Sequence, residues 1–134
     1  MEKQFFNSKE EQDIINVICN WSEQFFSQEV CGFVGVKNDI YTAILCRNKS
    51  RSPKNTFTID PVDYLFFVEE YEPLFVFHSH PIGDEGFSKE DIIMSENSCL
   101  PFVVYSLNTK ELNFHHPKKT KIPIESINKF KKQS

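Results

Sequence analysis

The most constraining feature of this 134-residue sequence is a continuous apolar run, residues 74–77, that leads directly into His78-Ser79-His80-Pro81. A short apolar run of this kind, bounded by turn-forming residues, is typical of a buried strand. Because side chains alternate along a strand, His78 and His80 project to the same side. The segment therefore predicts a buried strand that ends at a pair of imidazoles.

Two imidazoles at a strand end can bind one metal ion if a third ligand joins them. Ser88-Lys89-Glu90-Asp91 has the form of a capping box, which places Asp91 in the first turn of a helix that runs to about residue 97. The loop of residues 82–87 is short enough to bring Asp91 back to the histidines. Two His and one carboxylate are an accepted set for catalytic zinc, which keeps a fourth position open for water. The alternatives are a helix cap without a ligand role and buried histidines with ordinary hydrogen-bond partners.

Helical and strand periods alternate along the rest of the chain. Apolar side chains at spacings of four, three and four follow a capping-box pattern at Ser8 and indicate a helix. Asp60-Pro61 is typical of a helix start. The predicted elements are a helix over about residues 9–27, strands over 30–36 and 40–46, a short strand over 56–59, a helix after 61, the strand over 74–77, a helix over 89–97, and strands over 101–107 and 111–114. This order predicts an α/β fold with a mixed central sheet flanked by helices.

The length fits one domain. We expect that domain to cover residues 1–117, followed by a basic C-terminal extension, residues 118–134, that is partly packed or flexible. Ile127 and Phe130 in the extension could still pack as part of one more strand or a short helix. Its lysines are most simply a solvated tail, with an acidic partner as the alternative.

Composition and charge exclude several classes of protein. A net charge of −4 argues against nucleic-acid binding through bulk charge. No run approaches the roughly 20 apolar residues that cross a bilayer, and the N-terminus lacks the features of a signal peptide. Four widely spaced cysteines without a Cys-x-x-Cys pair indicate reduced thiols. We therefore expect a cytoplasmic protein that binds neither nucleic acid nor membrane.

Glu29 opens the apolar segment of residues 30–36. A metal-dependent hydrolase still needs a group that moves a proton, and an acid at the edge of an apolar strand is a candidate for that role. The alternative is a solvated carboxylate where a helix meets a strand.

Glu29, then His-Ser-His-Pro, then Ser88-x-x-Asp91, in this chain order, resemble the signature of the JAMM or MPN+ metalloproteases, also called JAB domains. Members are zinc hydrolases with a cytidine-deaminase-like α/β fold, and many of them cleave isopeptide bonds. The resemblance implies that residues 1–117 form a JAB/MPN-like metalloprotease domain of the prokaryotic or phage type. It gives Ser79 and Pro81 a structural role in shaping the turn that aims the imidazoles.

The resemblance also implies a role for each remaining signature residue. His78, His80 and Asp91 would bind zinc. Glu29 would act as general base on the zinc-bound water and then pass the proton to the leaving amine. Ser88 would donate a hydrogen bond to the developing oxyanion.

An enzyme of this type would cleave a peptide or isopeptide bond in a protein or peptide, such as the C-terminal tail of a ubiquitin-like protein or a peptide crosslink. Residues 48–60 are also similar to JAB domains of phage tail-assembly proteins. That similarity supports the alternative of a non-enzymatic assembly or docking module. A zinc deaminase of related fold is not supported, because its Pro-Cys-x-x-Cys element is missing.

Two weaker candidates remain. Cys31 lies near Glu29 and could be a nucleophile, although a small buried strand residue is the simpler interpretation. His115 and His116 could bind a second metal, but such a pair more often lies exposed at a strand end.

Overall fold

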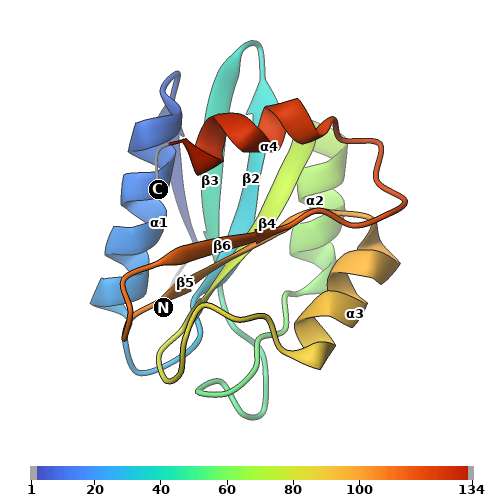
Figure 1. Cartoon of the computed structure of the whole chain (residues 1–134). Helices are drawn as coiled ribbons and strands as arrows, with labels where there is room; N and C mark the ends of the chain where they lie inside the picture. Colours follow the sequence, from blue (N-terminus) through green and yellow to red (C-terminus); the bar gives the residue numbers. More distant parts are fainter. Residues whose placement is uncertain (1–2, 133–134) are drawn as a thin grey trace.

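Six strands of the described part of the chain form one mixed sheet at the centre of the molecule (Figure 1). The computed structural model describes residues 3–132. Across the sheet the strands follow the order β1-β3-β2-β4-β5-β6, in which β4 and β5 are parallel and the other neighbours antiparallel. The strands are β1 (Gln4–Ser8), β2 (Cys31–Lys37), β3 (Ile40–Cys46), β4 (Glu72–His80), β5 (Phe102–Ser106) and β6 (Leu112–His115).

Within residues 3–132, four helices cover the two faces of the sheet. They are α1 (Glu11–Gln24), α2 (Pro61–Glu70), α3 (Lys89–Ser98) and α4 (Ile124–Lys131). Side chains of α1 and α4 share one apolar core with one face of the sheet, while α2 and α3 contribute to a second core on the other face. The predicted α/β fold with a mixed sheet flanked by helices is confirmed. No helix within residues 3–132 has the length and apolar character needed to span a bilayer.

Strand β4 is buried on both faces, as its apolar sequence predicts. Phe75 and Phe77 enter the core under α1 and α4, and Phe77 stacks on Trp21 with ring centroids 6.1 Å apart. Val76 belongs to the opposite core, on the α2 and α3 side. Alternation along the strand therefore carries His78 and His80 to the α2 and α3 side.

The edge strand β1 was not predicted. Its side chains are mostly exposed, so its sequence lacks the apolar alternation that marks a strand. Ser8 ends this strand and does not cap α1; its Oγ accepts from the Glu10 N–H (3.0 Å) and donates to Asp13 Oδ2 (2.7 Å). The short strand expected over 56–59 is also wrong, because this segment is part of a loop held by side-chain hydrogen bonds.

The segment expected as a C-terminal extension contains α4, which packs on the sheet. Ile127 and Phe130 are buried in the core, and the Phe130 ring meets Phe75 and Tyr41 edge to face, each at 5.1 Å. Residues 1–2 and 133–134, the outer ends of the two predicted segments, lie outside the described residues.

Replacing Phe130 with Ala should lower the free energy of unfolding by about 3–5 kcal/mol, because it opens a cavity in a closed core. Ile124→Ala on the same helix is the matched control, since Ile124 is 44% exposed and its loss should cost about 0.5 kcal/mol. Urea unfolding of both variants measures the difference. Equal small losses would show that α4 adds nothing to the core.

Candidate metal centre

The pairing of β2 with β4 brings Glu29 to the histidines. The two strands are antiparallel, with Cys31 opposite His78. Glu29 lies two residues before Cys31, and its carboxyl group is within 4.8 Å of a ring nitrogen of each histidine. Because side chains alternate, these residues share the face of the sheet that carries α2 and α3.

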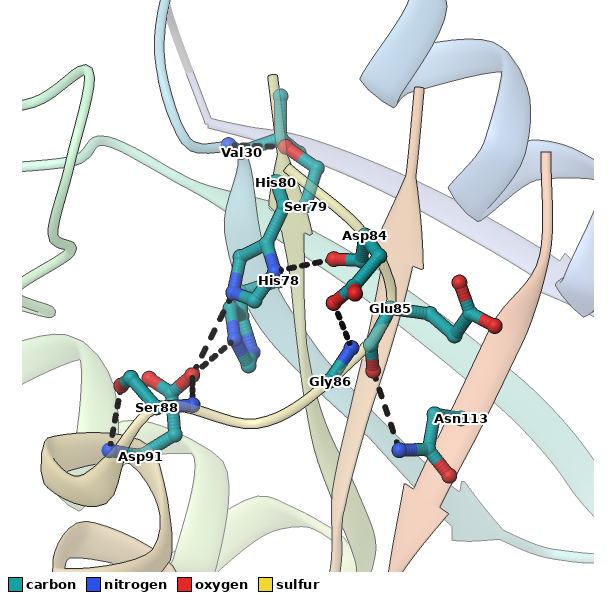
Figure 2. Close-up of polar contacts among 10 residues, drawn as sticks. All are labelled: Val30, His78, Ser79, His80, Asp84, Glu85, Gly86, Ser88, Asp91 and Asn113. Carbon is teal, nitrogen blue, oxygen red and sulfur yellow. Dashed lines mark hydrogen bonds and ion pairs between the residues drawn. The ribbon is translucent and has the colours of Figure 1, made fainter. Parts of the chain in front are cut away.

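Ser79, between the two histidines, fixes this register. Its N–H donates to the Val30 carbonyl (2.9 Å), and its Oγ accepts from the Val30 N–H (2.8 Å; Figure 2). The buried hydroxyl thus holds the start of β2 against the end of β4. Pro81 follows the last residue of β4 and has no N–H to continue the ladder. The positions of both residues agree with the structural role expected of them.

Glu29, His78 and His80 form a group of potential metal ligands. Each offers one ligand atom, and these atoms all lie within 4.8 Å of one another. Asp91 joins them, since its Oδ2 lies 3.1 Å from His78 Nε2 and 3.4 Å from His80 Nε2 (Figure 2). The structure therefore brings together the four residues that the sequence predicts as a base and three metal ligands, and their roles stay predictions. Imidazole nitrogens with carboxylate oxygens are the donors that zinc takes in catalytic sites.

The tautomer of His80 favours a cation in this site. His80 Nδ1 lies 2.8 Å from the Asp84 carbonyl oxygen, which can only accept, so Nδ1 carries the hydrogen. In neutral His80 the lone pair of Nε2 then faces a carboxylate oxygen of Asp91. Burial lowers the pKa of His80, but its hydrogen bonds to Asp91 and Asp84 outweigh burial and raise that pKa overall. Either a proton or a metal ion on His80 Nε2 places a positive charge beside the Asp91 carboxylate.

His78 is fully buried between aromatic rings. Its imidazole stacks on Phe57, with ring centroids 4.6 Å apart, and meets Phe102 edge to face at 6.0 Å. Burial lowers the pKa of His78, which favours the neutral imidazole that binds metals. Its Nδ1 has no hydrogen-bond partner within the described chain. Such an unpaired buried atom is uncommon. It is the other ring nitrogen, Nε2, that faces Asp91 and the site.

Ser88 and Asp91 form the capping box that the sequence predicts. Ser88 Oγ accepts from the Asp91 N–H (3.1 Å), and Asp91 Oδ2 accepts from the Ser88 N–H (3.1 Å). Burial opposes ionisation of Asp91, but hydrogen bonds from His78 and His80 hold its pKa well below the usual range. Because the cap uses Ser88 Oγ as an acceptor, its hydroxyl hydrogen remains able to donate.

Asn48 is a positioning residue that the sequence analysis missed. It is buried, and its Nδ2 donates to the carbonyls of Glu29 (3.0 Å) and Thr56 (2.9 Å). Its Oδ1 accepts from the N–H groups of Ser50 (3.0 Å) and Thr58 (3.1 Å). One side chain therefore joins the backbone of Glu29 to the loop that carries Phe57. An Asn directly after a strand is a turn signal, but nothing local shows that it contacts Glu29.

The loop after His80 is held by the β5–β6 hairpin. Ser106 Oγ donates to the Gly83 carbonyl (2.8 Å), and Asn113 Nδ2 donates to the Glu85 carbonyl (3.0 Å; Figure 2). These bonds fix the loop that presents the Asp84 carbonyl to His80. Ser106 and Asn113 were also missed, because they are distant in sequence from the residues they support.

Glu29 is only 5% exposed, and its environment disfavours the carboxylate. Burial raises its pKa to about 7; the charge of His80 opposes this increase, and the Asp91 charge adds a smaller increase. A carboxyl group with a pKa near neutrality is suited to accept a proton in one step and release it in another.

This raised pKa predicts that metal-free Glu29→Gln protein is more stable than wild type above pH 7. Between the ordinary pKa of 4.5 and the folded value of about 7, folded Glu29 keeps a proton that unfolded Glu29 loses. Wild-type stability should therefore fall as pH rises through this window, by up to about 3 kcal/mol. The glutamine side chain of the variant cannot titrate, so the two proteins should match near pH 4.5 and differ at pH 8. Urea unfolding at both pH values tests this, and parallel pH profiles would contradict it.

The weaker candidates do not join the site. Cys31 is fully buried, and burial raises the pKa of its thiol, so the residue is an inert part of the core. All four cysteines are free, as predicted. His115 lies 2.8 Å from Glu96, and within residues 3–132 neither His115 nor His116 belongs to a group of potential metal ligands.

Fold and site together define a small α/β domain with a candidate metal centre at one end of its sheet. No family model matches the chain. Tail tip assembly protein K of Escherichia phage N15 is 26% identical over 107 residues, which cover 80% of this chain and 44% of that protein. The chain thus spans less than half the length of this relative.

A solved structure has a similar fold. The solution structure of protein DSY2949 from Desulfitobacterium hafniense matches with a TM-score of 0.59 and 20% sequence identity. The match covers 84% of this chain and 92% of that one. At this identity the likeness concerns the fold alone.

Proposed function

We propose that the protein is a zinc-dependent hydrolase of the JAMM type, with the JAB/MPN variant of the α/β fold, that cleaves a peptide or isopeptide bond. The observation that carries the proposal is that Glu29 and Asp91 both lie beside the same two histidines, His78 and His80. These residues come from three separate segments. Beside Asp91 there is a second buried carboxyl group, that of Glu29, and its pKa is raised. Such a group is typical of functional sites and is not required by histidines that serve only packing.

His78, His80 and Asp91 would hold the zinc ion. When bound, zinc lowers the pKa of water and polarises a substrate carbonyl. Glu29 accepts the proton from the attacking water and delivers it to the leaving amine, since its pKa lies near neutrality. The Ser88 hydroxyl donates a hydrogen bond to the negative charge that develops on the carbonyl oxygen.

The substrate is a protein or peptide, such as the C-terminal tail of a ubiquitin-like protein or a peptide crosslink. A panel of peptide and isopeptide substrates, incubated with the zinc-loaded protein, tests the proposal. We expect turnover that stops when a chelator removes the metal and returns when zinc is added. Absence of turnover across the panel from a zinc-loaded, folded protein would contradict it.

The second candidate is a non-enzymatic assembly module, for example in phage tail assembly. Its support is the similarity to a protein named for tail tip assembly. This function predicts a tight protein partner that copurifies with the chain and no hydrolysis of any substrate. Copurification that survives mutation of His80, together with an inactive wild type, would favour this candidate.

A further inference from the structure

The loop between β3 and α2 forms part of the wall of the metal centre. The Glu29 N–H donates to the Pro53 carbonyl at 2.6 Å, in addition to the Asn48 bond to the Glu29 carbonyl. Both backbone polar groups of Glu29 are therefore bonded to this loop. The part of the loop around Pro53 therefore lies next to the site.

Both arginines of the chain lie in this loop. The sequence contains thirteen Lys but only two Arg, Arg47 and Arg51. The planar guanidinium binds a carboxylate through two parallel hydrogen bonds, which a lysine cannot do. In a chain that otherwise uses Lys as its cation, this placement points to recognition of a carboxylate.

The two arginines face different surroundings. Along β3, Ala43 and Leu45 enter the core under α1, whereas Ile44 and Cys46 belong to the core on the side of the site. Arg47 directly follows Cys46, so the same alternation directs the Arg47 side chain to the α1 side of the sheet. Arg51 lies further along, two residues before the Pro53 carbonyl that binds Glu29.

Arg51 lies in a loop held by backbone hydrogen bonds, and its side chain has no partner among the described residues. Its neighbours are fixed, because the Ser52 N–H donates to Ser50 Oγ and the Ser52 carbonyl accepts from the N–H groups of Asn55 and Thr56, all at 3.0 Å. The Arg51 side chain is exposed, and no hydrogen bond, ion pair or ring contact to it occurs within residues 3–132. The Lys54 side chain is likewise exposed and has no such contact within residues 3–132.

The acidic side chains of this loop and of the metal centre already have roles. Asp60 pairs with Lys49 at 2.9 Å, and the carboxyl groups of Glu29 and Asp91 belong to the metal centre. The loop therefore carries two exposed cations, Arg51 and Lys54, for which residues 3–132 provide no ion pair.

We propose that Arg51, supported by Lys54, binds a carboxylate of the substrate close to the bond that is cleaved, so that the substrate is an acidic peptide or isopeptide. This inference rests on the proposed hydrolase function. Two residues span at most about 7 Å, the arginine side chain extends about as far again, and the Glu29 side chain adds about 5 Å, so the carboxylate lies within about six residues of the scissile bond.

The test uses zinc-loaded protein and capped alanine octapeptides that carry one Glu at each position in turn, with Gln at the same position as the neutral match. We expect kcat/KM to be about 10-fold higher for Glu than for Gln at one position, as a charge-assisted bidentate contact provides. In Arg51→Met this ratio should fall to within about twofold of unity, and in Arg47→Met, the matched control, it should stay unchanged. A wild-type ratio near one, or equal ratios in both variants, overturns the inference and leaves the hydrolase proposal standing.

A binding experiment decides the matter if none of the octapeptides is cleaved. With two arginines, the protein has two side-chain Nε–H signals in its NMR spectrum, which Arg51→Lys assigns. The Glu peptide should shift the Arg51 signal and the Gln peptide should not, which would support carboxylate recognition even if the hydrolase proposal fails. No shift, or an equal shift with inorganic phosphate at the same concentration, overturns the inference.

Discussion

Replacing Glu29 with Gln is expected to lower the hydrolytic rate of the zinc-loaded protein by about 100- to 10,000-fold, the range that general acid–base groups contribute. Gln keeps the shape of the side chain but cannot accept a proton from the attacking water. The backbone of Glu29 is held by Asn48 and Pro53, so the substitution should leave the local structure intact. Single-turnover rates measured at saturating zinc provide the comparison.

Zinc content separates two roles for Glu29. Its carboxyl group lies close enough to both histidines to be a ligand itself. If Glu29 is the general base, Glu29→Gln retains zinc and loses activity; if it is a ligand, zinc affinity falls as well. Glu90→Gln, an exposed carboxyl in the same turn as Asp91, is the control and should change neither property. Full activity in Glu29→Gln would end the assignment of Glu29 as the base.

Replacing His80 with Ala is expected to weaken zinc binding at least about 100-fold, since even groups that only orient a ligand contribute 10- to 100-fold. The substitution removes the nitrogen that Asp84 orients toward Asp91. Competition with a chromophoric chelator measures the affinity, and metal analysis after dialysis measures the content. Hydrolysis should be lost in parallel.

His116→Ala is the control for this experiment, because His116 lies outside the group of potential ligands in the described chain. It should bind zinc as wild type does. Equal zinc in wild type and His80→Ala would remove the metal centre from the proposal, even if the fold were unchanged.

Most residues of the candidate site could be predicted from the sequence because each belongs to a recognisable local pattern. His78 and His80 share a face by strand alternation, and Ser88 with Asp91 forms a capping box by helix geometry. The structure places these four residues and Glu29 at one end of the sheet. Their roles as zinc ligands, base and hydrogen-bond donor remain predictions.

The residues that hold the site had no such signal. Asn48 contacts Glu29 across 19 positions of the chain, and Asn113 contacts Glu85 across 28. The edge strand β1 owes its structure to pairing with β3, since its own residues are mostly exposed. Pairing of distant segments depends on the register of the whole sheet, which periodicity cannot reveal.

The sequence by itself determined the class of fold, the strand that ends in two histidines, and the cap that presents Asp91, because each depends on neighbours within one turn or strand. Only the tertiary structure decided that Glu29 lies beside the two histidines, that its pKa rises to about 7, and that the loop bonded to the Glu29 backbone carries Arg51, exposed and without a partner in the described chain. The burial of a side chain and the charges around it are set by segments far apart in the chain, so they are defined only once those segments have packed together.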